Sequence, residues 1–219
     1  MLILLPPSEG KNLAQGSKKF ALKNLSFAAE LSDLRTQAIT QFDPALLKAV
    51  TSPAISIYSG VLYQALDWDS LGVKARTRGA EELLIISALY GVVRPEDPIA
   101  PYKHKIKTSL WKKRITELLE PLEAEVIVDA RSSTYAGVWT PPADIAISIR
   151  VFQEKNGKRS VITHMSKKYR GELTRLLLQS KKARTPHDVY EIARTQYVCE
   201  LIAPRAGSPW YLDLIIRTD

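Results

Sequence analysis

Three polar segments each follow an apolar run that predicts a buried strand, and their side chains are of types that bind anions or transfer protons. They are Ser8 and Lys11 after 2–5, Arg94 and Tyr102 after 83–86, and Asp129, Ser132 and Tyr135 after 126–128. Because α/β proteins place ligand loops at the ends of strands, we expect these segments to meet in one pocket. In that pocket Asp129 is the candidate general base, and Lys11 would stabilise an anion.

The segment 6–12, PPSEGKN, allows several interpretations. It is not a P-loop, because the first glycine of that motif is missing and Asn12 replaces the Ser or Thr that binds magnesium. Ser8 and Lys11 have the spacing of a serine nucleophile with a lysine base, but the companion motifs of that enzyme class are absent. A structural loop with a turn at Gly10 and an anion-binding Lys11 both stay open.

The segment 129–137, DARSSTYAG, has a structural and a functional interpretation. Ser132, Ser133 and Thr134 are good helix-capping residues, and capping alone would account for them. The functional alternative is a wall of hydroxyls and one carboxylate at the carboxyl end of a strand.

Three cations crowd the first turn of a predicted helix over 167–180, at Lys167, Lys168 and Arg170. A helix N-terminus carries partial positive charge, so cations are unfavourable there. A bound phosphate would reconcile these side chains with the helix dipole. The alternative is that the lysines are simply solvated.

The net charge of the chain is +8 and its pI is about 9.5, which favours anionic partners such as nucleic acid or phosphorylated small molecules. The segment 150–184 holds eleven Lys and Arg but only two acidic residues, a surplus of nine. Charge so concentrated in sequence predicts a basic patch, with an inert basic surface as the alternative. No zinc finger, RNP motif or GXXG loop is present, although tyrosines interleaved with cations could stack bases.

The sequence predicts no metal site and no cofactor, because His104, His164 and His187 are scattered and none has ligand spacing to a cysteine. A carboxylate site for magnesium stays open. The one cysteine, Cys199, excludes an internal disulfide and fits a reducing cytosol. No apolar window is long enough to span a membrane, and the apolar start is too short for a signal peptide. We therefore expect a cytoplasmic protein with no membrane partner.

Apolar periodicity and turn signals indicate the elements that carry these residues. Strands are predicted at 2–5, 83–86, 126–128, 198–202 and 211–216, and helices over 25–50 with a break at Asp43-Pro44, within 53–68, and over 109–119 and 167–180. Asn156-Gly157 between the apolar runs 145–152 and 160–165 predicts a β-hairpin. In the first part of the chain the predicted strands and helices alternate, whereas toward the C-terminus the predicted strands pair with their neighbours in sequence. The prediction is a mixed α/β (α+β) fold, one domain over 1–219 with a central mixed sheet flanked by helices.

Several strings resemble the YaaA family of bacterial peroxide stress proteins across nearly the whole chain. They are MLILLPPSEGK, LYGVVRPEDPIAPYK, DARSSTYAGV, FQEKNGK and SKKYRGELTRLLL. The resemblance implies a cytoplasmic protein that protects against hydrogen peroxide, with a single-domain α/β fold and a basic cleft that binds double-stranded DNA. It also implies a helix-hairpin-helix element, but 37–56 is shorter here than in the family and lacks an Asn-x-x-Arg-Phe stretch. The cleft residues that carry over are Lys11, Arg94, Lys103, Lys167, Lys168 and Arg170.

Three hypotheses follow from the residues and the resemblance together. The first is DNA binding through backbone phosphates, with weak sequence preference. The second is an enzyme that acts on a nucleotide or a nucleic-acid base in the same cleft, and the third is a scaffold that binds a partner without touching nucleic acid. Under the first two hypotheses Arg94 and Tyr102 should lie near Lys11 and Lys167, whereas His104 and Lys105 have no part in the cleft.

Overall fold

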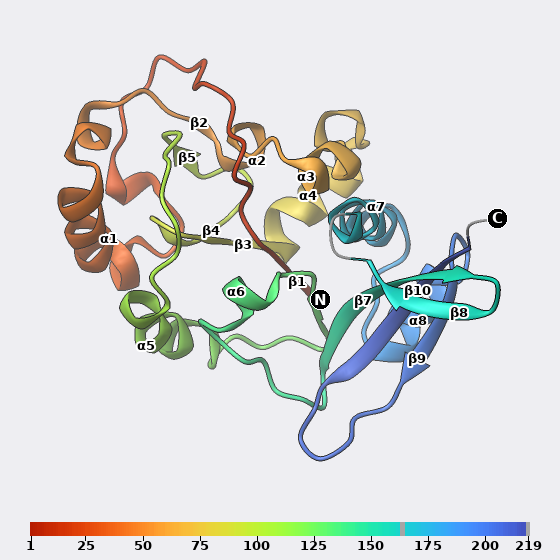
Figure 1. The fold of residues 1–219 in the computed structure, drawn as a ribbon. Helices are drawn as coiled ribbons and strands as arrows, with labels where there is room; N and C mark the ends of the chain where they lie inside the picture. Colours follow the sequence, from red (N-terminus) through yellow and green to blue (C-terminus); the bar gives the residue numbers. More distant parts are fainter. Residues whose placement is uncertain (163–164, 218–219) are drawn as a thin grey trace.

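One mixed sheet organises the computed structural model, which describes residues 1–162 and 165–217. Its strands follow the order β4-β3-β1-β6-β7-β10-β9, with β8 paired to the far end of β7 (Figure 1). Five strands run parallel: β1 Leu2–Leu5, β3 Leu83–Ser87, β6 Ile127–Asp129, β7 Ala146–Lys155 and β10 Trp210–Arg217. Three pair antiparallel: β4 Gly91–Val93, β8 Lys158–Val161 and β9 Val198–Ile202. A separate small pair joins β2 Ser52–Pro53 to β5 Pro98–Ile99.

The central strands are apolar on both faces because both faces are covered. All residues of β3 are buried, and so are the last three residues of β1. Parallel strands that are covered on both sides read as continuous apolar runs rather than alternating ones. Leu2–Leu5 and Leu83–Ser87 fit that pattern and form the floor of the core.

Helices and short 3₁₀ turns connect and cover the strands (Figure 1). The α-helices are α1 Ala28–Phe42, α2 Ala54–Ile57, α3 Val61–Leu66, α4 Val73–Glu82, α5 Thr108–Leu119, α6 Ser133–Ala136, α7 Ser166–Gln179 and α8 Pro186–Ala193. The 3₁₀ turns are η1 Leu22–Asn24, η2 Pro44–Lys48 and η3 Trp68–Ser70. Helix α7 packs against α3 and α4, and α1 contacts α5.

The strand order creates a switch point beside β1. The chain leaves β1, adds β3 on one side, and later returns to place β6 on the other side. The chain therefore leaves β1 toward one side of the sheet and leaves β6 toward the other. Open α/β sheets bind ligands at the carboxyl ends of two such neighbouring strands. The loop that begins at Pro6 and the loop that begins at Ala130 meet at this edge.

The predicted mixed α/β fold is confirmed. The hairpin also forms, with Asn156 and Gly157 at positive φ (52° and 72°) between β7 and β8. The break at Asp43-Pro44 separates α1 from η2 as expected. Thr163 and His164, part of the predicted second half of the hairpin, lie outside the described residues.

The segment that follows β3 contains two short strands. The chain turns tightly after β3 to form β4, and it later forms β5. Gly91 has φ +72°, and a Cβ there would lie 2.6 Å from the Trp111 ring, so glycine is required on two grounds. Buried Trp111 donates its Nε1–H to the carbonyl of Ala88 at 3.0 Å, which fixes the turn to α5.

Gly171 sets the distance between α7 and α3. A Cβ at this position would lie 2.1 Å from the carbonyl oxygen of Leu62, which belongs to backbone and cannot rotate away. Helix α7, which carries Arg170, can therefore pack this closely against α3 only with glycine at position 171.

Gly171→Ala is expected to lower the free energy of unfolding by about 3 kcal/mol, because the added methyl forces the two helices apart. Gly137→Ala is the matched control, since its new Cβ would have 3.7 Å to the nearest atom at an ordinary helical φ of −62°. Chemical denaturation of both variants measures the difference. Equal stabilities would show that the α3–α7 contact is not sterically limited.

Candidate functional site

A cavity of about 650 Å³, which we call the switch-point pocket, lies where the loops after β1 and β6 meet α3 and α7. Its lining is Pro6, Pro7, Ser8, Glu9, Gly10, Gly60, Val61, Leu62, Tyr63, Lys105, Ile106, Ala130, Ser132, Thr134, Tyr135, Lys167 and Arg170. This set contains three cations and one carboxylate, together with three aliphatic hydroxyls and two tyrosines. The volume suits one small ligand or one nucleotide unit.

The loop after β1 is held against the start of α3 by a short network. The Ser8 hydroxyl donates to the carbonyl of Gly10 and accepts the N–H of Ser59 at 3.1 Å. A Cβ on Gly60 would lie 2.8 Å from the Ser8 Cβ, so the two segments touch. The Tyr63 hydroxyl donates to the carbonyl of Pro6 at 2.7 Å. These contacts make the wall that Ser8 lines rigid before any ligand arrives.

Lys11 lies at the edge of this wall with an unusual set of neighbours. Its Nζ donates to the Ser8 carbonyl at 2.7 Å and sits 4.2 Å from the centre of the Tyr102 ring. A second ring, that of Tyr58, is 5.7 Å away. Among residues 1–162 and 165–217 no carboxylate forms an ion pair with it. Burial lowers the pKa of Lys11 to about 8, opposed in part by the charge of Glu9.

Tyr102 lies beside Lys11 as predicted, but it is a buried support. Only 6% of the residue is exposed. Its hydroxyl is 2.8 Å from Ser87 Oγ and 3.2 Å from the Tyr58 hydroxyl, and it accepts the N–H of Ala88 at 3.1 Å. Burial raises the pKa of Tyr102. The ring can hold the Lys11 ammonium by a cation–π contact, but it is not open to stack on a base.

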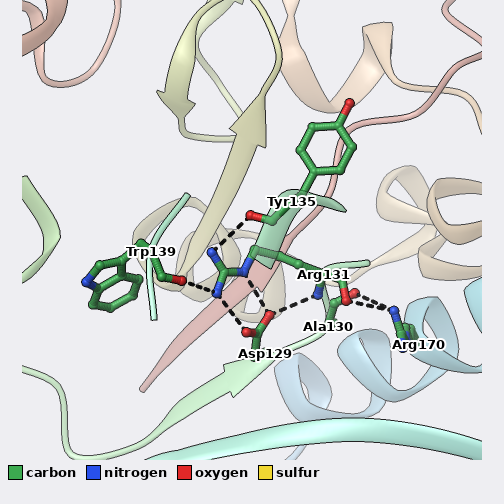
Figure 2. Close-up of polar contacts among 6 residues, drawn as sticks. All are labelled: Asp129, Ala130, Arg131, Tyr135, Trp139 and Arg170. Carbon is green, nitrogen blue, oxygen red and sulfur yellow. Dashed lines mark hydrogen bonds and ion pairs between the residues drawn. The ribbon is translucent and has the colours of Figure 1, made fainter. Parts of the chain in front are cut away.

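Asp129 is occupied by a neighbour that sequence reasoning missed. Arg131 donates Nε–H and Nη2–H to the two carboxylate oxygens at 2.8 and 2.7 Å, in a bidentate pair (Figure 2). The same guanidinium donates to the carbonyls of Trp139 at 2.9 Å and Tyr135 at 3.4 Å. Asp129 therefore positions the loop after β6, and we do not retain it as a general base. The only available signal was an Arg two residues after an Asp at the end of a strand.

The loop that Arg131 folds presents hydroxyls to the pocket. Ser132 is the N-cap of α6, yet its side chain makes no capping bond, so the capping interpretation does not account for it. Ser132, Thr134 and Tyr135 all line the pocket. Burial raises the pKa of Tyr135 to about 12, and Tyr102 and Glu9 add to the effect, so this hydroxyl is a proton donor at neutral pH.

The side chain of Arg170, on α7, is fixed by hydrogen bonds to backbone carbonyls. Its guanidinium donates to the carbonyls of Arg131 at 2.8 Å and Ala130 at 3.4 Å (Figure 2). It also donates to the carbonyl of Ile149 at 3.1 Å. Burial lowers the pKa of Arg170, and Asp129 opposes that effect. The remaining cations of the pocket, Lys105 and Lys167, are exposed. Lys105, which the sequence analysis left out of the cleft, is one of the residues that line the pocket.

Arg94 does not lie where the sequence predicted. Its guanidinium donates to the carbonyls of Ala80 and Glu81, just before β3 begins, and lies 5.5 Å from the Phe27 ring. That is the amino end of the parallel strands, whereas Lys11 and Lys167 are at the carboxyl end. Arg94 supports the fold at the other edge of the sheet, and the expectation that it joins Lys11 is wrong.

Lys103 and Lys168 also lie outside the pocket lining. Lys103 is exposed in the segment that leads to α5, two residues before Lys105. Lys168 forms an ion pair with Glu172 at 3.6 Å along α7. Of the two lysines in the first turn of α7, Lys167 therefore lines the pocket, and the charge of Lys168 is neutralised by Glu172.

The run of positive charge over 150–184 does not stay uncompensated. Among residues 1–162 and 165–217, six of its eleven cations form ion pairs, several with acids that lie elsewhere in the sequence. The pairs are Arg150–Asp213, Arg159–Glu154 and Arg159–Glu200, Lys168–Glu172, Arg175–Asp67, and Lys182 and Arg184 with Glu125. The surplus of nine in the sequence thus overstates the charge that this segment presents to a ligand.

In the part of the chain that the structure describes, no group of three or more His, Cys, Asp or Glu side chains is arranged to hold a metal ion. None of the helices in that part has the length and apolar character needed to cross a membrane.

The amino-acid sequence is similar to those of known proteins. A family model described as "Peroxide stress protein YaaA" matches residues 1–201. A UPF0246 protein of Streptomyces coelicolor is 32% identical over 99% of this chain and 99% of its own length. A UPF0246 protein of Corynebacterium efficiens is 36% identical over 89% of this chain and 92% of its own. An uncharacterized protein of Campylobacter jejuni is 34% identical over 74% and 67%.

Asp129→Asn is expected to cost about 3 kcal/mol of unfolding free energy, because it leaves the fully buried Arg131 guanidinium without its counter-charge. Asp213→Asn is the matched control. Its partner Arg150 is 41% exposed, so solvent can take over and the cost should be about 1 kcal/mol. Urea denaturation at neutral pH compares the two. A cost for Asp129→Asn no larger than for Asp213→Asn would show that the Asp129–Arg131 pair does not anchor the loop.

Proposed function

Because the chain belongs to the family of the peroxide stress protein YaaA, we propose that it acts in the response to hydrogen peroxide by binding DNA at the switch-point pocket. The family name supplies the link to peroxide stress. The DNA contact is what the resemblance to the family implies, and the chemistry of the pocket supports it. Phosphate groups of the backbone are the expected contacts, with weak preference for sequence.

The observation that carries the proposal is a pocket with three cations and one carboxylate at the carboxyl end of the sheet. Lys105, Lys167 and Arg170 come from two different segments and converge on one cavity. Glu9 is the one acid that lines it. A cavity with this surplus attracts an anion, and its hydroxyls can complete the hydrogen bonds of a phosphate.

The segment 100–107 extends the positive charge beyond the pocket. Lys103, Lys105 and Lys107 are exposed at every second residue, while Tyr102 is buried and Ile106 is half-buried. The three exposed lysines form a track of positive charge that a polyphosphate chain can follow away from the pocket.

A second function is supported by the shape of the pocket. Its volume of about 650 Å³ fits a single phosphorylated small molecule, and Tyr135 offers a protonated hydroxyl inside it. An enzyme that acts on a nucleotide or a nucleic-acid base would use the same cations. Without Asp129 as a base, that function needs a different proton acceptor, and Lys11 is the group with a suitable pKa.

The double variant Lys105→Ala/Lys167→Ala is expected to weaken binding of a duplex oligonucleotide on every sequence tested. Removing two phosphate contacts should also lower the slope of log K against log salt by about 2. Fluorescence anisotropy at several salt concentrations measures both quantities. Lys168→Ala is the control, because it removes the same charge from the same helix outside the pocket and where Glu172 already neutralises it.

Binding that does not respond to salt, or equal losses in the double variant and in Lys168→Ala, would contradict DNA binding at this pocket. Thermal unfolding with nucleoside mono-, di- and triphosphates then tests the second function. A ligand that binds the folded state raises the melting temperature by linkage.

Peroxide sensing through a cysteine thiolate is not expected. Burial is the main cause that raises the pKa of Cys199, the one cysteine of the chain, to about 11. The thiolate, which is the form that attacks peroxide, is then about 10⁻⁴ of the population at pH 7. Iodoacetamide labelling of the unfolded protein after brief peroxide treatment should find Cys199 still reduced, and Cys199→Ser should leave oligonucleotide binding unchanged. Rapid conversion of Cys199 to sulfenic acid would contradict this expectation.

A further inference from the structure

We propose that the amine of Lys11 forms an imine with an aldehyde carried by a phosphate-bearing ligand of the switch-point pocket. This inference rests on the proposed function in one respect only, that the pocket holds phosphate. It goes further by giving Lys11 covalent chemistry and the ligand a carbonyl group.

The surroundings of Lys11 are those of a nucleophile rather than of a structural cation. Its Nζ rests on the Tyr102 ring and makes one hydrogen bond to the carbonyl of Ser8. Structural lysines usually pair with a carboxylate, and the described residues offer this amine none within ion-pair distance. Its titratable neighbours are Glu9, Tyr58 and Tyr102. Of these only Glu9 is an acid that is charged at neutral pH.

Burial also makes the neutral amine of Lys11 available at physiological pH. Because burial lowers the pKa of Lys11 to about 8, about one molecule in ten carries the unprotonated amine at pH 7. An ordinary lysine is unprotonated in roughly one molecule in several thousand. Desolvated lysines of this kind form Schiff bases with carbonyl substrates.

The position of Lys11 fits a ligand that has both a phosphate and a carbonyl. Ser8 accepts the Lys11 hydrogen bond and also lines the pocket, so the amine lies at the pocket edge. The pocket cations Lys105, Lys167 and Arg170 would hold the phosphate. A sugar phosphate in its open-chain form joins the two groups within one small molecule. Such a unit occurs as a free sugar phosphate and as the abasic deoxyribose of damaged DNA.

The step balances without any oxidant or metal. The lone pair of neutral Lys11 Nζ forms a bond to the aldehyde carbon, and the π electrons of C=O move to oxygen. Proton transfer from nitrogen to that oxygen gives a carbinolamine. Loss of water then gives the protonated imine, with Tyr135 as the pocket hydroxyl able to donate a proton to the departing oxygen.

Trapping with sodium borohydride tests the inference, because hydride reduces the imine to a stable secondary amine. The wild-type protein is treated with borohydride in the presence of a duplex that has one abasic site, an intact duplex, or free deoxyribose 5-phosphate. Denaturing gels and intact-mass spectra detect the adduct, and peptide mapping finds the modified lysine. Lys11→Arg keeps the charge but has no nucleophilic amine, and Lys168→Arg is the matched control on α7.

An adduct on Lys11 that falls at least tenfold in Lys11→Arg and persists in Lys168→Arg is expected. Adduct with the abasic duplex alone identifies DNA as the source of the aldehyde, and adduct with deoxyribose 5-phosphate alone identifies a free sugar phosphate. Absence of adduct, or an adduct mapped to another lysine, overturns the inference. Peptide mapping of the wild type gives this answer even where Lys11→Arg does not fold. Salt-dependent oligonucleotide binding that persists without an adduct leaves the proposed function standing.

Discussion

The paired charges of Asp129 and Arg131 at the end of β6 hold the site together. Arg131 satisfies the carboxylate and also draws in the carbonyls of Tyr135 and Trp139, which folds the loop after the strand. The carbonyl of Arg131 is in turn the acceptor that fixes Arg170. One buried pair thus sets both the hydroxyl wall and the cationic wall. Its desolvation is tolerable because every donor of the contact finds a carboxylate or carbonyl.

The pocket concentrates positive charge although the protein disperses most of it. Ion pairs neutralise six cations of the 150–184 run, often with acids from distant parts of the chain. Lys105 and Lys167 are exposed at the pocket and form none of the ion pairs found among the described residues, and Lys11 is isolated against aromatic rings. Net charge therefore says less about a binding surface than the positions of the acids do. A single carboxylate, Glu9, opposes the cations at the pocket.

Polar residues that follow strands in the sequence indicated the edge of the sheet where the pocket lies, but not all of the residues that line it. Ser8, Ser132 and Tyr135 follow β1 and β6, and the parallel pairing of those strands is enough to bring them together. The prediction that Arg94 lies near Lys11 was wrong because β4 runs antiparallel to β3, so the residues after β4 return to the opposite edge of the sheet. That reversal depends on a tight turn at Gly91 packed under Trp111, a tertiary contact with no local signal. The role of Arg131 was also missed because it depends on the tertiary structure. An Arg two residues after an Asp is expected to be solvated unless the fold buries it.

The location of Lys11 beside Tyr102 argues for chemistry rather than for affinity alone. A lysine that only binds phosphate gains from full charge and from solvent-accessible reach, as at Lys105 and Lys167. Lys11 instead gives up part of its hydration on burial, which lowers its pKa to about 8 and weakens it as a permanent cation. Tyr102 cannot move to relieve this, because Ser87, Tyr58 and the Ala88 amide all hold its hydroxyl. In this proposal the exposed lysines, Lys105 and Lys167, attract the ligand, and the fixed, partly desolvated amine of Lys11 meets its reactive carbon.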